Sequence, residues 1–197
     1  MKRFIAYAFA ALACAFLFGC AHPINMNPDL AALAAPANVK PINKKAGYHM
    51  PDALRALEVT TPGGGGDKVR YFPYRDIEPG FYKALSEVFT NVTKVQNPKD
   101  LAALQASGVS LLITPEVTTT SYSDGAFTWP PTQFSVKLVC DITDANGKAV
   151  QTVTVTGNGA ATFDEFKANF SLAAVRASNE ALAKLIKALA ESPELRK

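Results

Sequence analysis

The sequence has little of what most catalytic and metal-binding sites are built from. Only two of its 197 residues are histidine, His22 and His49, and only three are cysteine. A zinc site or a histidine-dependent catalytic triad needs several such side chains at defined spacings. The patterns C-x-x-C, G-x-S-x-G and S-x-x-K are also missing from the chain. We therefore expect neither an enzyme nor a bound cofactor or metal.

A cluster of glycines at 63–66, in TPGGGGDKV, lacks the spacing of a phosphate-binding loop, because its Lys68 follows an aspartate and no G-K-[ST] is present. It predicts a turn between two strands. The carboxylates are scattered along the chain, which favours capping and surface roles over a catalytic pair.

Neither sign of charge is in large excess. Lysine and arginine total 20 against 17 aspartates and glutamates, and without Lys2 and Arg3 the balance is 18 against 17. Proteins that bind nucleic acid carry a basic patch that neutralises phosphates. We expect no nucleic-acid partner.

What the sequence does contain is a three-part amino terminus. Lys2 and Arg3 precede an apolar run over 4–18, and a small residue then stands before Cys20. The run is shorter than the roughly 20 residues that cross a bilayer as a helix. This layout is typical of a secretory signal, so we expect residues 1–19 to be removed.

The tetrapeptide LFGC that ends at Cys20 resembles the lipobox of bacterial lipoproteins. The resemblance implies acylation of Cys20, cleavage after Gly19 and, because Ala21 rather than an aspartate follows, delivery to the outer membrane. Several acyl chains would anchor the protein stably. The alternative is an ordinary signal cut within 13–15, which would leave Cys20 incidental.

Four prolines and many small residues separate Cys20 from Gly47. Such a composition favours a flexible segment over a long helix. We expect a lipidated tether over 20–47 and one domain over 48–197, periplasmic if the outer-membrane signal holds.

Within the domain, hydrophobic periodicity predicts an α/β fold. It is a two-layer sandwich, in which a mixed sheet with a long antiparallel hairpin carries helices on one face. Asn146-Gly147 between alternating segments is the strongest turn signal. Strands are expected over 54–61, 68–74, 91–95, 109–123, 134–144 and 148–159, and helices after an N-cap at Asp76, over 101–107 and over 171–192.

Two side-chain patterns bear on the core. Cys140 falls on the apolar face of a strand, which favours a buried thiol over a reactive one. The last helix has an apolar seam that predicts packing against the sheet rather than a coiled coil; the seam is Leu172, Val175, Asn179, Leu182, Ile186 and Leu189.

Aromatic and arginine side chains gather in two segments that suit partner binding. Tyr71, Tyr74 and Arg75 lie in RYFPYRD, and Trp129 stands before two prolines. Rigid aromatic and arginine side chains dominate many interfaces. The alternative is that these rings close the ends of the core.

The body of the chain, from about residue 54 to 189, is similar in layout to YajG-type lipoproteins and to the domain shared by CsgG-like secretion lipoproteins and the amino-terminal part of TolB. The matching parts are RDIEPGFYKALSEVF, SLLITPEVTTTSYSDG, FSVKLVCDITDANGKAVQTVTVTGNG and EALAKLIKALA. The resemblance implies a non-catalytic structural or assembly role, through contacts with other envelope proteins. A module that binds a periplasmic glycan or small ligand is the alternative.

Overall fold

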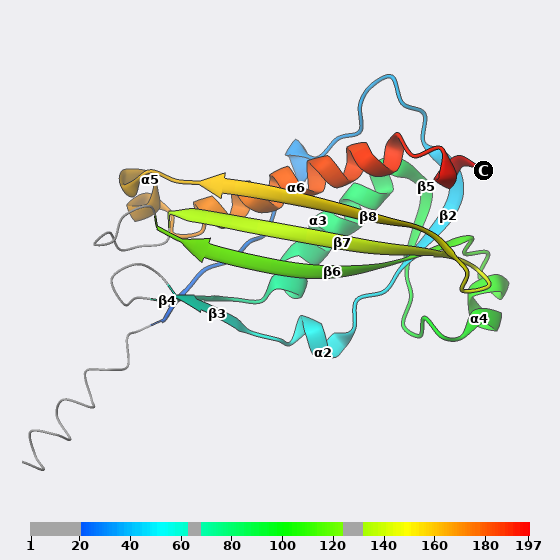
Figure 1. Cartoon of the computed structure of the whole chain (residues 1–197), viewed down its shortest axis with the longest axis horizontal. Helices are drawn as coiled ribbons and strands as arrows, with labels where there is room; N and C mark the ends of the chain where they lie inside the picture. The colour runs from blue at the N-terminus through cyan, green and yellow to red at the C-terminus, as the bar shows by residue number, and fades with distance from the viewer. Residues whose placement is uncertain (1–20, 63–67, 124–131) are drawn as a thin grey trace, which may run out of the picture.

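The computed structural model describes residues 21–62, 68–123 and 132–197, and these form two β-sheets with helices packed against them (Figure 1). The larger sheet has five strands in the order β5-β2-β6-β7-β8. Its strands are β2 (Ile42–Tyr48), β5 (Phe89–Lys94), β6 (Leu111–Tyr122), β7 (Gln133–Asp144) and β8 (Ala149–Ala160). Strand β2 runs parallel to both β5 and β6, whereas β6, β7 and β8 are antiparallel. The predicted α/β class and the long hairpin are confirmed.

A smaller sheet has the order β1-β4-β3, from β1 (Ala21–Pro23), β4 (Lys68–Tyr71) and β3 (Val59–Pro62). Strand β1 is parallel to β4, and β3 is antiparallel to it. The sequence predicted a single mixed sheet, and the division into two was not anticipated. Part of the strand expected over 54–61 is instead the short helix α2 (Asp52–Arg55).

Two long helices, α3 (Pro73–Val88) and α6 (Leu172–Ala190), cover one face of the larger sheet and enclose the main core. The short helix α4 (Leu101–Ala106) lies on the other face. There Leu104 packs with Leu112, while the neighbouring strand residues Leu111 and Ile113 point into the main core. The expectation that all helices share one face therefore holds for α3 and α6 but not for α4.

Helix α6 packs against the sheet, as predicted, and lies on β8 with a partly different face. Leu182, Ile186 and Leu189 are buried, whereas Leu172, Val175 and Asn179 are only half-buried. Small residues take their place against the sheet, where α6 approaches Gly157 and Gly159 of β8. Because the strand has no side chains at those two positions, the alanine face of the helix can lie on its backbone.

The segment 21–47 is part of the fold, so the expectation of a flexible tether over 20–47 is wrong for these residues. Met26, Leu33 and Ile42 are at most 3% exposed. The segment also contains β1, the 3-10 helix η1 (Leu30–Ala32) and most of β2, which lies between β5 and β6. Of its prolines, Pro23 ends β1, Pro36 precedes a turn at 37–38 and Pro41 precedes β2.

Two further details differ from the sequence expectations. Helix α3 begins at Pro73 after Phe72, and Asp76 lies inside its first turn rather than at the N-cap. A short helix that was not predicted, α5 (Phe163–Ala168), begins with a capping box between Thr162 and Glu165. Cys140 is fully buried, as predicted, and burial raises its pKa to about 12.

Charged side chains from α6 bond to the last part of the outer edge of β8, over 156–160. Lys184 Nζ donates to the carbonyl oxygen of Thr156 at 2.8 Å, and an Arg176 nitrogen donates to that of Ala160 at 2.6 Å. Between them, the Glu180 carboxylate accepts the backbone N–H of Asn158. Backbone groups of an edge strand, which otherwise offer a template for pairing, are thereby engaged within the chain.

In the part of the chain that the structure describes, no helix combines the length and the apolar character required to cross a bilayer.

Candidate functional site

Charged side chains gather where the parallel strands β2 and β5 end. Tyr48 is the last residue of β2 and Lys94 the last of β5, while Glu78 comes from α3 and Arg55 from α2. In open α/β sheets, ligands bind at the carboxyl ends of parallel strands. This end of the sheet is therefore the first place where a functional site is expected.

Glu78 is the centre of this group. Its Oε1 accepts from Lys94 Nζ at 2.8 Å, and its Oε2 accepts from Arg55 Nε at 2.6 Å. The Tyr48 hydroxyl donates to the same Oε1 at 3.3 Å. With only 11% of its side chain exposed, Glu78 is a nearly buried carboxylate that carries two positive partners.

The ionisation of these groups follows from their surroundings. Burial pushes the pKa of Glu78 upward, but hydrogen bonds and charges from Lys94 and Arg55 outweigh burial and hold that pKa below its usual value. Burial, reinforced by the charge of Glu78, raises the pKa of Tyr48 to about 12. At neutral pH, Glu78 is thus an ionised carboxylate whose charge is balanced by Lys94 and Arg55, and Tyr48 is a neutral phenol. Their arrangement fastens α2 and α3 to the strand ends.

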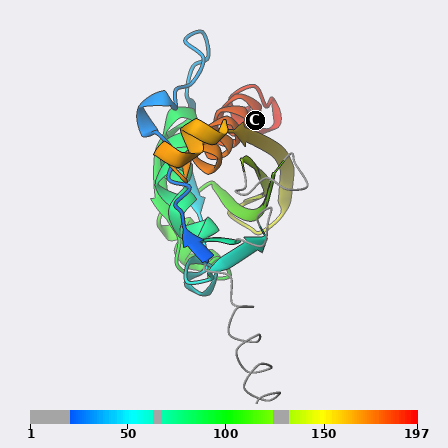
Figure 2. The same ribbon diagram turned by 90° about the vertical axis from the view of Figure 1, so that its left-hand side faces the viewer.

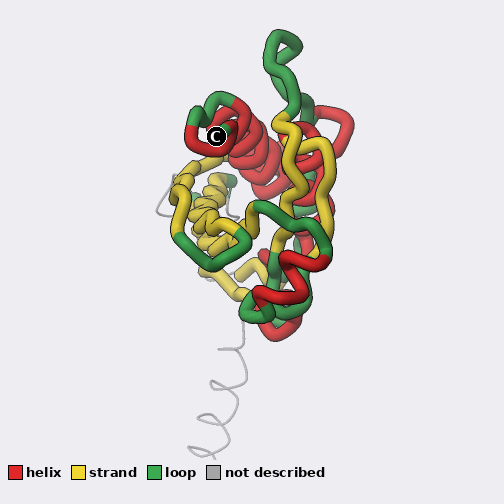
Figure 3. The backbone as a smooth tube through the Cα atoms, turned by 90° about the vertical axis from the view of Figure 1, so that its right-hand side faces the viewer, coloured by secondary structure: helices red, strands yellow, loops and turns green. Residues whose placement is uncertain are grey.

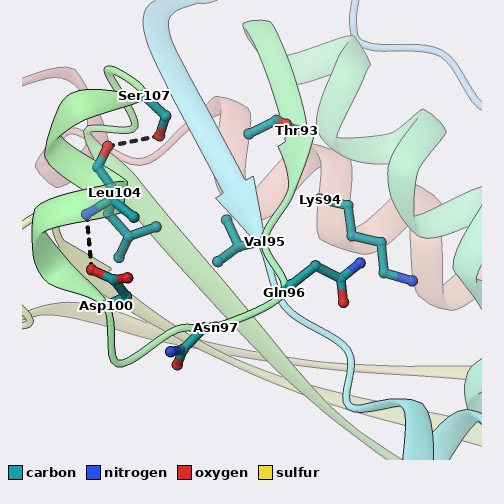
Figure 4. A pocket seen from close by; sticks show the side chains of 9 residues that line it. Thr93, Lys94, Val95, Gln96, Asn97, Asp100, Leu104 and Ser107 are labelled. Carbon is teal, nitrogen blue, oxygen red and sulfur yellow. Dashed lines mark hydrogen bonds between the residues drawn. The ribbon is translucent and has the colours of Figure 1, made fainter.

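A cleft of about 330 Å³ lies beside this group, between the end of β5 and α4 (Figure 4). Its apolar walls include Val95 and Leu104. Lys94 contributes to the lining but extends away from α4 in Figure 4, consistent with its bond to Glu78. The cleft has room for a small ligand.

The polar groups of the cleft serve the local structure. Asp100 Oδ1 accepts the backbone N–H of Ala103 at 3.0 Å and caps α4, and Ser107 Oγ donates to the carbonyl oxygen of Leu104 at 2.8 Å. These bonds shape α4 and the walls of the cleft. The arrangement can hold a small polar molecule, but a nucleophile paired with a base is absent from the residues that line it.

A metal centre is not evident in the described ranges 21–62, 68–123 and 132–197. There, no three histidine, cysteine, aspartate or glutamate side chains come together in a way that could hold an ion.

Two of the residues predicted to bind a partner are buried. Tyr71 is 1% exposed and Tyr74 is 6% exposed. The Tyr71 hydroxyl lies 2.7 Å from Thr119 Oγ1, and the Tyr74 hydroxyl accepts the backbone N–H of Val117 at 3.1 Å. Both rings therefore belong to the core and support β6. The prediction that they bind a partner is wrong, and the alternative, that they are part of the core, is correct.

Arg75 is half-exposed and is engaged with its neighbours. Its guanidinium lies 3.1 Å from the Asp76 carboxylate and 3.7 Å from the ring centroid of Phe72. Buried Asp76 also accepts the backbone N–H of Met26, which ties the amino-terminal segment to α3. Trp129 and Cys20, the remaining predicted site residues, lie outside the described residues.

Sequence reasoning did not find the group around Glu78. Its four members come from β2, α2, α3 and β5. No short motif joins them, and only the parallel pairing of β2 with β5 brings Tyr48 and Lys94 to one edge. The terminal Tyr and Lys of two strands are the only signal that could have indicated it.

Comparison with known proteins gives no family for the chain: no family model matches it, and no curated protein matches it significantly. Similar solved structures include protein XCC0632 from Xanthomonas campestris, a DUF330 protein, with a TM-score of 0.47 and 9% identity over 87% of this chain and 92% of that one. A minor lipoprotein from Acinetobacter baumannii has a TM-score of 0.40 and 13% identity, over 79% of this chain and 93% of the other.

A PelC dodecamer from Paraburkholderia phytofirmans has a TM-score of 0.38 and 14% identity over 75% of this chain and 94% of that one. Lipoproteins are thus among the structural neighbours by name. At these TM-scores the likenesses define no function for this chain.

Proposed function

We propose that this protein is an outer-membrane lipoprotein, anchored through acyl chains on Cys20, that serves as a non-catalytic structural or assembly partner of other cell-envelope proteins. The anchor is supported by the basic start, the short apolar run and the LFGC lipobox. The folded domain begins directly after this anchor, because β1 starts at Ala21.

The observation that carries the non-catalytic part is the state of the buried carboxylates. Glu78 is bonded to Arg55 and Lys94, and Asp76 to Arg75 and backbone N–H groups. A general base must be available to take a proton from a substrate. Carboxylates that are already bonded to basic groups and backbone N–H groups instead hold neighbouring elements of the fold together.

The alternative, a glycan-binding or small-ligand module, is weaker on structural grounds. It relied on Tyr71, Tyr74 and Trp129. The first two present no ring at the surface, and Trp129 lies outside the described residues. Within the described residues, the cleft between β5 and α4 supports it, since Gln96 and Asn97 line that cleft.

Anchoring is tested by expressing Cys20→Ala and wild type in the source bacterium, with labelled fatty acid and separation of the two membranes. Wild type should incorporate label and fractionate with the outer membrane, and Cys20→Ala should remain an unlabelled precursor. Cys140→Ser is the matched control, because that buried thiol should have no part in acylation. Equal labelling of Cys20→Ala and wild type would refute the anchor.

The partner role is tested by photo-crosslinking the lipidated protein in its own envelope. Discrete cross-linked protein species that disappear in Cys20→Ala support an assembly partner. Repeated recovery of glycan without any cross-linked protein would favour the alternative function.

A further inference from the structure

Two phenylalanines are exposed at one end of the domain. Phe163, in α5, is 54% exposed, and Phe170, just after that helix, is 42% exposed. Phe170 rests on buried Phe166, with ring centroids 4.8 Å apart. The ammonium group of Lys167 lies 4.7 Å from the ring centroid of Phe163. Two phenylalanines exposed on one short helix and the residues that follow it offer an apolar surface at this end of the domain.

The first described residues of the chain lie at this same end. The rings of His22 and Phe170 have centroids 5.8 Å apart, and the backbone N–H of Asn25 donates to Ser171 Oγ at 3.1 Å. Figure 2 looks at this end and shows both β1 and α5 facing the viewer. The beginning of the domain and its exposed phenylalanines are therefore neighbours in space.

The fold provides no spacer between the predicted acylation site and this end. Ala21 is already paired with Lys68 of β4, and the Cα atoms of consecutive residues are about 3.8 Å apart. If the acyl chains of Cys20 lie in the hydrocarbon, Ala21 is within a few ångströms of the lipid headgroups. The surface beside it, which includes Phe170, must face the membrane.

We propose that this end of the domain, defined by β1, α5 and Phe170, lies on the membrane surface with Phe163 and Phe170 among the lipid headgroups. The inference rests on the proposed acylation of Cys20. It adds an orientation: the long axis of the larger sheet points away from the membrane.

The chemistry of this end suits a lipid surface. Aromatic rings concentrate in the interfacial region of bilayers, where an apolar ring meets polar headgroups. Exposed Lys68 can lie beside lipid phosphates, as can Lys167, which also pairs with Asp164 at 2.8 Å. Basic side chains near an anionic surface strengthen attachment. Lipid anchoring combined with a second contact fixes the orientation of a domain that a single flexible link would leave free.

The opposite end supplies the reference for a test. Helix α4 and the C-terminus lie there, as Figure 3 shows from that side. Strand β7 has 12 residues, which at about 3.4 Å per residue span roughly 40 Å. A probe next to α4 should therefore stay in water while a probe on α5 meets the membrane.

The experiment uses the full lipidated protein in vesicles of phosphatidylethanolamine and phosphatidylglycerol. A nitroxide is attached at Asp164→Cys, whose native side chain is 89% exposed, or at Lys99→Cys beside α4. Cys140 is buried, and Cys20 carries the lipid, so the introduced thiol is the one that reacts. Accessibility of the nitroxide to oxygen and to a water-soluble nickel complex measures its depth.

The ratio of oxygen to nickel accessibility should be several times higher at Asp164→Cys than at Lys99→Cys. Adding Phe163→Ser and Phe170→Ser should lower the ratio at Asp164→Cys, whereas Leu57→Ser and Tyr82→Ser, two exposed hydrophobic positions elsewhere, should leave it unchanged. If the mass of the wild-type protein shows no acyl chains, the proposed function itself is overturned. If the protein is acylated but the oxygen-to-nickel ratio is equal at Asp164→Cys and Lys99→Cys, only the membrane-facing orientation is overturned. The same holds if the nitroxide at Asp164→Cys remains accessible to the nickel complex.

Discussion

Gly157 of β8 lies directly beneath Ala181 of α6: a Cβ placed on Gly157 would fall 2.8 Å from the Ala181 Cα and still closer to the backbone of the same helix. The distance between helix and sheet is therefore set by the absence of a side chain. Gly159 repeats the arrangement against Ala173.

Gly157→Ala should destabilise the domain. The added methyl has backbone rather than a flexible side chain in its way, and overpacking of this kind costs about 1 to 3 kcal/mol. Urea unfolding followed by circular dichroism measures the change. Thr154→Ala, at an exposed position of the same strand, is the control and should stay within about 0.5 kcal/mol of wild type.

Met26→Ala tests whether the amino-terminal segment belongs to the core. Met26 is fully buried, and truncating a buried methionine costs about 2 to 5 kcal/mol. Leu30→Ala changes a 43% exposed residue of the same segment and should have almost no effect on the unfolding midpoint. If Met26→Ala lowered the unfolding midpoint no more than Leu30→Ala, the segment would behave as a free tether.

Tyr74→Phe should destabilise the protein through one hydrogen bond. The Tyr74 hydroxyl accepts the backbone N–H of Val117, and a buried donor left without a partner costs about 1 to 3 kcal/mol. Tyr82→Phe removes a hydroxyl from a 47% exposed ring and is expected to be silent. If instead Tyr74→Phe left stability unchanged, Val117 would have to find another acceptor.

Glu78 should make the stability of the domain depend on acid pH. Because the pKa of Glu78 is lowered in the folded state, its contribution is complete above the ordinary carboxyl pKa and is lost as pH falls through the lowered value. The free-energy difference between wild type and Glu78→Gln should therefore be largest near neutral pH and shrink in acid. A difference that is constant with pH would show that Glu78 titrates alike in both states.

Local signals explain which parts of this fold could be predicted. Asn146-Gly147 and the alternation on either side specify the β7-β8 hairpin without reference to the rest of the chain, and Gly147 does adopt a positive φ of 78°. The same alternation placed Cys140 inside. In these cases the neighbours that decide the structure are close in sequence.

Long-range packing explains the failures. Proline-rich sequence suggested a tether, yet Pro28 packs against Gly80 of α3, some fifty residues away. The rings of Tyr71 and Tyr74 resembled interface residues because their partners, Thr119 and Val117, are in β6. The group around Glu78 required four separate segments to meet, and no periodicity encodes such a meeting.

The engaged end of the β8 edge would have a consequence if the protein is anchored to a membrane as proposed. Copies that share one orientation on a membrane meet repeatedly side by side, at an effective concentration far above that of the same chains in solution. An open strand edge would then join neighbouring copies into a growing sheet. Lys184, Glu180 and Arg176 bond to backbone groups of Thr156, Asn158 and Ala160. A neighbouring strand could pair with this part of β8 only by breaking those bonds, which would help to keep copies anchored as proposed separate.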